Sequence, residues 1–328
     1  MRVARYRPLL GWPRAEPARL AGPACRQLFG RGREALAAWF AGLGRGEVLV
    51  SAQICPAVPF LLRRMGFTPV YLDLDPVFPC PSGEAFARAV TERTVAVLAS
   101  PMYGLAREWK SWQGPPLVLD LAQGLGAWPE LCEQAEAVVY SFGLGKGADT
   151  GGGLLCSRQK VSVAGTSLAP FLGTVAQGVA LRGLLASGLY RFFVQRGVAL
   201  EKEDRPVHPR RGPAWLEGFC LARVAVYLEQ AELARRRYRE LPGALAEYAE
   251  CLPLRAILRL PQRDRVLARL RERGIDAEPA GEPLPGEYDP GAGGPFPQAE
   301  RFLAEGLRLP FLGRLSPAEF EHVKRSLP

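Results

Sequence analysis

The first 160 residues contain a series of short, uninterrupted apolar runs, and this pattern most narrows the folds open to the chain. The runs lie at 47–51, 69–73, 95–99, 117–120 and 137–142. Successive side chains of a strand point to opposite faces, so a continuous apolar run indicates a strand that is buried on both. Stretches of helical character separate most of the runs. The sequence therefore predicts an α/β protein with a mostly parallel sheet covered by helices.

Two helices are expected among these strands. Apolar residues follow helical spacing over 33–43. A second helix is expected to begin at Pro56 and to end at Gly66, because proline suits a first helical turn and glycine suits a helix end. Residues 1–30 are rich in proline, arginine and glycine, and they read as an irregular arm.

The pattern changes after residue 205. A charged amphipathic helix is expected over 214–240, followed by strands at 254–260 and 307–311, a helix at 264–273 and a last helix at the end of the chain. A loop rich in glycine and proline occupies 281–295. The expected organisation is a large domain over 1–205, with its N-terminal arm, and a small α+β domain over 206–328.

One stretch without charge, 161–181, raises the question of a membrane. It contains proline, glutamine and several small polar residues, whereas a membrane span is more uniformly apolar. A buried or interface helix is the favoured interpretation. The N-terminus has no apolar segment typical of a signal peptide. The seven cysteines are odd in number, with no CxxC pair, and indicate reduced thiols in the cytoplasm.

The count of histidines and the distribution of charge limit the chemistry further. Two histidines exclude a His-rich metal site, and no metal is expected. The net charge is +9, but the arginines are spread along the chain and no nucleic-acid-binding motif accompanies them. Nucleic-acid binding therefore rests on charge alone. Attraction of an anionic small molecule explains the positive balance equally well.

Lysine is scarce in this chain, which draws attention to Lys146. Only five lysines stand beside 37 arginines, and there is no asparagine. Four of the lysines lie in polar or chain-edge contexts. Lys146 instead lies in the glycine-rich segment 143–147, directly after an apolar run. This segment lacks the glycine and Ser/Thr positions of a P-loop.

Three segments bring reactive groups to the carboxyl ends of the expected strands, where doubly wound sheets bind ligands. Residues 30–33 start a helix with glycines and arginines that suit a phosphate, Asp120 ends one strand, and Ser141 and Lys146 follow another. Singly, Asp120 reads as a helix cap and Lys146 as a surface lysine. Together, an amine, a carboxylate and a phosphate cradle are what pyridoxal phosphate (PLP) requires.

These segments resemble the DegT/StrS family of PLP-dependent sugar aminotransferases, within the fold-type I enzymes. The resemblance is carried, in order, by an early block of 51–56 through 65–76, by 119–127, by 140–146 leading into 151–153, and by a C-terminal signature at 274–275, 296–300, 309–310 and 315–316. It implies a large domain with a mostly parallel sheet covered by helices and a smaller α+β C-terminal domain. It also implies that PLP is the cofactor.

The resemblance assigns roles to particular residues. Lys146 would carry PLP as a Schiff base and move protons, and Asp120 would pair with the pyridinium nitrogen. Gln123 would contact the ring hydroxyl, Ser141 and the backbone of Gly32 and Arg33 would bind the phosphate, and Cys55 stands where an aromatic residue often stacks on the ring. Arg33 occupies a position that is usually Ser or Thr. The partner-subunit Asn-Tyr-Arg motif has no counterpart here.

The implied function is transfer of an amino group from a glutamate-like amino acid to a keto-sugar-like acceptor. The implied assembly is a cytoplasmic homodimer, with neither nucleic acid nor membrane as a partner. Two alternatives to an aminotransferase stay open. One is a PLP enzyme of another reaction type, such as elimination. The other is a non-catalytic paralogue with a structural or regulatory role.

Overall fold

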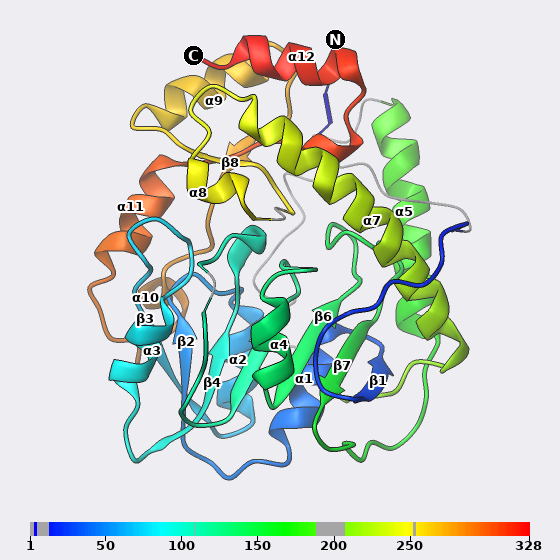
Figure 1. Cartoon of the computed structure of the whole chain (residues 1–328), viewed down its shortest axis with the longest axis vertical. Coiled ribbons are helices and arrows are strands. Elements are labelled where there is room, and N and C mark those ends of the chain that lie inside the picture. Colours follow the sequence, from blue (N-terminus) through cyan, green and yellow to red (C-terminus); the bar gives the residue numbers. More distant parts are fainter. Residues whose placement is uncertain (1–2, 5–12, 108, 188–206, 252–253) are drawn as a thin grey trace.

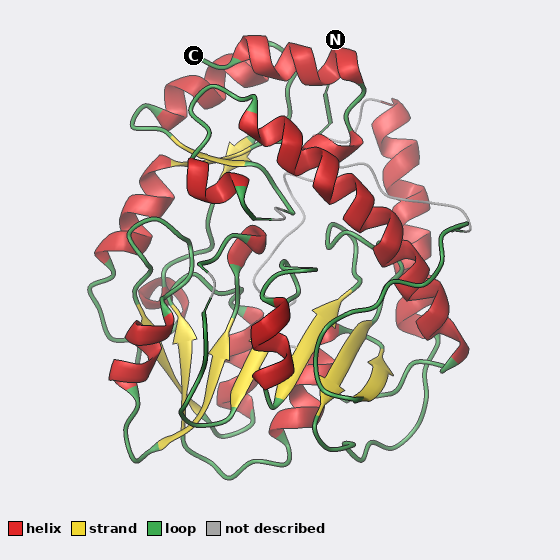
Figure 2. Ribbon diagram, in the orientation of Figure 1, coloured by secondary structure: helices red, strands yellow, loops and turns green. Residues whose placement is uncertain are grey.

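The computed structural model describes residues 3–4, 13–107, 109–187, 207–251 and 254–328. A seven-stranded sheet lies at its centre (Figures 1 and 2), in the order β1-β7-β6-β5-β4-β2-β3. Its strands are β1 (Cys25–Phe29), β2 (Glu47–Ser51), β3 (Thr68–Leu72), β4 (Thr94–Ala99), β5 (Leu117–Asp120), β6 (Ala137–Ser141) and β7 (Gly153–Ser157). The neighbours from β3 to β6 pair in parallel, and only β7 runs against its neighbours. The mostly parallel sheet is confirmed.

Alternate residues of the central strands enter two separate cores, as strands buried on both faces require. Val48 and Val50 of β2 pack with α1 (Gly32–Phe40) and α2 (Ala57–Arg64) on one face. Leu49 of the same strand belongs to the core on the other face. That second core continues without a break into α7 (Trp215–Arg239) and the C-terminal segments.

The remaining helices of the first part of the chain are shorter or lie at the margin of the sheet. They are α3 (Gly83–Ala89), the 3-10 turn η1 (Met102–Gly104), α4 (Pro129–Gln134) and α5 (Ala169–Ser187). Figure 1 shows α7 passing diagonally from the neighbourhood of α5 to the C-terminal layer. The expected helix over 214–240 is therefore confirmed.

The C-terminal part is a small layer of helices on a three-stranded antiparallel sheet with the order β8-β10-β9. Its elements are α8 (Ala246–Ala249), β8 (Ile257–Arg259), α9 (Arg263–Glu272), β9 (Glu278–Pro279), α10 (Pro285–Tyr288), α11 (Pro297–Glu305), β10 (Gly306–Arg308), the 3-10 turn η3 (Leu312–Arg314) and α12 (Pro317–Ser326). The expected α+β character agrees with these elements. The domain boundary at 205/206 borders residues 188–206, outside the described ranges, and stays a prediction.

Two expectations need correction. Residues 25–29 of the expected irregular arm form β1, which pairs with β7 along its whole length. Of the uncharged stretch 161–181, only the part from Ala169 is helical. Leu172, with 60% of its surface exposed, and Val179, with 57%, show that this helix face is not buried within one chain. No helix in the described ranges combines the length and apolar character that a membrane span requires.

Candidate active site

A cavity of about 750 Å³ opens at the carboxyl ends of β5 and β6, beside the start of α1. Segments far apart in the sequence form its wall: the turn before α1, the β2–α2 connection, the ends of β5 and β6, and α5. The lining residues are Gly30, Arg31, Gly32, Arg33, Leu36, Cys55, Ala57, Val58, Asp120, Ala122, Ser141, Gly143, Leu144, Lys146, Gly151, Gly152, Ala169, Pro170, Gly173, Thr174 and Gln177.

Asp120 brings a buried carboxyl group to the cavity wall. It ends β5 with 6% of its surface exposed, and its Oδ1 accepts a hydrogen bond of 3.0 Å from the Ala122 N–H. Burial raises the pKa of this carboxyl, and the Ala122 N–H and the positive charge of Lys146 act in the opposite direction. A buried carboxylate of this kind favours a cationic partner in the cavity.

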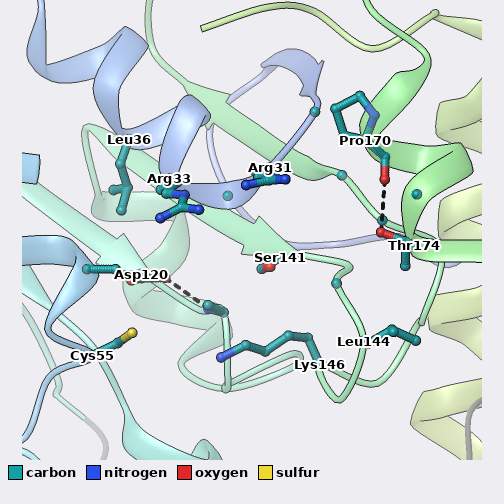
Figure 3. Close-up of a pocket in the computed structure, with 18 of the residues that line it drawn as sticks. Arg31, Arg33, Leu36, Cys55, Asp120, Ser141, Leu144, Lys146, Pro170 and Thr174 are labelled. Atoms are coloured by element: carbon teal, nitrogen blue, oxygen red, sulfur yellow. Dashed lines mark hydrogen bonds between the residues drawn. The ribbon is translucent and has the colours of Figure 1, made fainter. Parts of the chain in front are cut away.

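Lys146 reaches into the same cavity from the loop between β6 and β7. Its backbone N–H donates to the Gly143 carbonyl over 3.0 Å, which closes a tight turn just before the lysine. In Figure 3 the Lys146 amine is directed across the cavity toward the side that carries Asp120 and Cys55. The amine and the carboxylate thus face one space from different loops.

Ser141 and the start of α1 form one end of the cavity. A side chain at Gly32 would place its Cβ 3.2 Å from the Ser141 Cβ, a tighter contact than most, so glycine favours the close approach of the two segments. The first backbone N–H groups of a helix have no acceptor within the helix and attract anions. Arg33 adds a guanidinium that Figure 3 shows on the same side as Ser141. This end suits a phosphate group.

The structure brings together six of the residues predicted from the sequence and leaves one aside. Gly32, Arg33, Cys55, Asp120, Ser141 and Lys146 all line the cavity. Gln123 does not line it; its side-chain N–H contacts the Met102 sulfur at 3.7 Å. Its predicted contact with the ring hydroxyl stays a prediction.

α5 contributes to the cavity although no sequence pattern predicted it. Ala169, Pro170, Gly173, Thr174 and Gln177 form a wall of the cavity. The Thr174 hydroxyl donates to the Pro170 carbonyl over 3.0 Å, which satisfies this group within the helix (Figure 3). Apolar and small polar residues gave no local signal that one face of this helix borders a site.

The residues of the cavity fit PLP in their chemistry. The cradle at Gly32 and Ser141 suits the phosphate, the buried Asp120 suits a protonated ring nitrogen, and the Lys146 amine suits an aldehyde carbon. Within the described residues, no three His, Cys, Asp or Glu side chains gather in an arrangement that could hold a metal ion.

Comparison with known protein families finds a match to part of this chain. The DegT/DnrJ/EryC1/StrS aminotransferase family matches residues 33–160, a range that contains Arg33, Cys55, Asp120, Ser141 and Lys146. Comparison with curated proteins finds no match.

Several solved structures share the fold at low sequence identity. A Streptococcus pneumoniae protein described as a sugar aminotransferase, in its PMP form, is 17% identical, with a TM-score of 0.66 over 93% of this chain and 87% of its own. DesI, solved with its TDP-sugar product, is 22% identical, with a TM-score of 0.66 and coverages of 94% and 80%. DesV of S. venezuelae, solved with a ketimine intermediate, is 20% identical, with a TM-score of 0.64 and coverages of 93% and 84%.

Proposed function

We propose that this chain is a PLP-dependent aminotransferase of the DegT type, because residues 33–160 match the DegT/DnrJ/EryC1/StrS aminotransferase family. It transfers an amino group from a glutamate-like amino acid to a keto-sugar-like acceptor. The observation that carries the proposal is the placement of the Lys146 amine and the buried Asp120 carboxyl in one cavity, with a phosphate cradle at its end.

Each group of the cavity has a role in holding the cofactor. Lys146 attaches it through its amine, Asp120 pairs with the ring nitrogen, and Ser141 with the start of α1 binds the phosphate. When bound, PLP supplies an electron sink that lets an amino group leave the donor. The Lys146 amine lies in the same cavity and can accept and return the proton that this transfer requires.

The acceptor is proposed as an anionic keto sugar. DesI was solved with a TDP-sugar product, and this chain shares its fold. The net charge of +9, with Arg31 and Arg33 at the cavity, favours an acceptor that carries phosphate groups.

The visible spectrum of the purified protein tests the proposal. We expect a yellow preparation after incubation with PLP, and loss of the yellow colour when glutamate is added, because the amino group passes to the cofactor. A yellow protein that no amino acid bleaches would favour the non-catalytic paralogue. A colourless protein, or one that binds PLP without attachment to a lysine, would remove the proposed function.

We also propose a homodimer, formed through the exposed face of α5. Leu172, Val175 and Val179 expose 60%, 46% and 57% of their surfaces on a helix that borders the cavity. An apolar face of this kind is costly in water unless a partner covers it. Sedimentation at micromolar concentration, followed at the visible absorbance of PLP, should show a dimer. A PLP-loaded monomer would contradict the proposal.

Two further features complete the proposal. None of the seven cysteines, all of which lie in the described ranges, forms a disulfide, and this supports action in the reducing cytoplasm. We retain the division into a large PLP-binding domain over 1–205 and a small domain over 206–328. The separate C-terminal sheet supports this division, although one hydrophobic core joins the two parts.

Arg33→Ala is expected to weaken PLP binding by about 1.5–3 kcal/mol, the value of a hydrogen bond to a charged group. This corresponds to roughly a tenfold to 150-fold higher Kd. Arg45→Ala is the control, because Arg45 is an exposed arginine that lies before the amino end of β2, opposite the cavity, whereas Arg33 is half-buried at its wall. Fluorescence titration with PLP measures both. Equal affinity of the Arg33 and Arg45 variants would place Arg33 outside the phosphate site.

A further inference from the structure

The peptide groups on both sides of Lys146 are bound by arginines from the C-terminal part of the chain. The Gly147 carbonyl accepts a hydrogen bond of 2.7 Å from Nη2 of Arg314, and the Gly145 carbonyl accepts one of 3.3 Å from Nη2 of Arg255. Both arginines are buried, with 8% of Arg255 and 7% of the Arg314 side chain exposed. The lysine is therefore held between two fixed carbonyl groups.

Asp149 links the same loop to Arg314 by a second route. Its Oδ1 accepts the Gly145 N–H at 3.1 Å, and its Oδ2 accepts Nη1 of Arg314 at 2.9 Å. The side chain of Asp149 has no exposed surface, and its backbone lies in the left-handed region with a φ of 60°. Aspartate is one of the few non-glycine residues that adopt this conformation, and the two carboxylate contacts stabilise it here.

Arg314 is also held by residues outside the Lys146 loop. Its Nε donates to the Gln230 side chain over 2.8 Å, and its guanidinium carbon lies 5.4 Å from the centre of the Phe311 ring. Phe311 in turn stacks on Tyr227 of α7, 5.8 Å away. A side chain at Gly147 would place its Cβ 2.7 Å from the Tyr227 ring, so the loop rests directly on this layer.

We propose that Arg314 is a positioning residue, which sets the place of Lys146 in the cavity by binding Gly147 and Asp149. The inference rests on the proposed function, in which Lys146 attaches the cofactor. Gly145 and Gly147 flank the lysine with φ values of 78° and 96°, and glycines give a loop much conformational freedom. The charged hydrogen bonds from Arg314 remove that freedom before the cofactor arrives.

A lysine could not replace Arg314 in this role. Its single ammonium group cannot reach the Gly147 carbonyl, the Asp149 carboxylate and the Gln230 side chain in the planar arrangement that the guanidinium provides. Arg314→Lys therefore keeps the charge and removes the geometry. Asp149→Asn keeps the size and an acceptor for the Gly145 N–H, and it removes the ion pair.

Hydrogen exchange on the protein without cofactor tests the proposal directly. In Arg314→Lys, we expect the amides of residues 143–151 to exchange at least about tenfold faster than in the wild type, because the loop opens more easily. Asp149→Asn should accelerate the same amides, and the double variant should add little to Arg314→Lys. Arg259→Lys is the control, since Arg259 forms a largely buried ion pair with Glu305 that does not involve the Lys146 loop.

A second measurement connects the loop to the lysine. Borohydride traps the PLP that has attached to the lysine, and the trapped amount over time gives the rate of attachment. This rate should fall about tenfold in Arg314→Lys and stay within about twofold of the wild type in Arg259→Lys. Exchange of residues 143–151 that is unchanged in Arg314→Lys, or equally fast in Arg259→Lys, would overturn the positioning role. Failure of the wild-type protein to trap PLP on Lys146 would instead overturn the proposed function, whatever the exchange data show.

Discussion

Lys146→Ala is expected to abolish covalent attachment of PLP and to lower amino transfer by at least about two to four orders of magnitude. That range is the contribution of a positioned general acid–base, and loss of the covalent link adds to it. The cavity offers no replacement, because Lys146 is the only lysine among the residues that line it within the described part of the chain. PLP itself should still bind, through the phosphate cradle at Gly32 and Ser141.

Borohydride reduction followed by peptide mapping measures this prediction. The chain has only five lysines, so each reduced peptide is easily assigned. Lys160→Ala is the control, since Lys160 is exposed and lies after β7, outside the cavity. The label should appear on Lys146 in the wild type and in the Lys160 variant. A label on another lysine, or none, would remove Lys146 from its proposed role.

The strands that form the middle of the sheet could be predicted because burial on both faces leaves a local signal. Val48, Leu49 and Val50 show it directly, since successive residues enter opposite cores and all three must be apolar. The edge strand β1 gave no such signal. Its neighbour β7 did carry one, since Leu154 and Cys156 enter one core and Leu155 the other, and this short run was missed. Gln27 of β1 is a polar residue that is nevertheless buried. Its side chain donates to the Val161 carbonyl and accepts from the Val161 N–H, a partner far along the chain.

The candidate site was predictable to the extent that it lies at strand ends. Asp120 and Ser141 end strands β5 and β6, and parallel neighbours bring such residues to one edge of a sheet. Gln123 was expected in the cavity and does not line it. The placement of its side chain depends on the turn after Asp120 rather than on its distance from Asp120 in the sequence. The contacts of Arg314 with the Lys146 loop join residues that are 165 positions apart, and no pattern within either segment reveals them.

Asp120→Asn is expected to keep or raise the stability of the protein without PLP and to lower its catalytic rate. Burial raises the pKa of the Asp120 carboxyl, so in the protein without PLP the charged form is less favourable when folded than when unfolded. The ionisation of Asp120 therefore lowers the stability of the protein without PLP as the pH rises above the ordinary pKa of an aspartate, until the pH exceeds the raised pKa of the folded state. Asparagine carries no charge and can still accept the Ala122 N–H. The variant without PLP should be at least as stable as the wild type at pH 7.

Catalysis should change in the opposite direction. A protonated ring nitrogen would be the partner of the buried Asp120 carboxylate, and asparagine cannot hold that positive charge. Removing one member of a buried pair costs roughly 3–5 kcal/mol. If this loss falls on the proton-transfer step, the rate drops by about two to three and a half orders of magnitude. If Asp120 only caps the turn at Ala122, asparagine caps it about as well and the rate should hardly change.

Two measurements on the same variant decide between these roles. Thermal unfolding without PLP at pH 5 and pH 7 gives the stability, and stopped-flow loss of the yellow colour with glutamate gives the rate. We expect a Tm equal to or above that of the wild type, with its advantage greater at pH 7 than at pH 5, because a raised Asp120 pKa makes the wild type lose stability as the pH rises and asparagine does not titrate. A rate within about threefold of the wild type, less than 1 kcal/mol in the barrier, would show that Asp120 does not act on the cofactor.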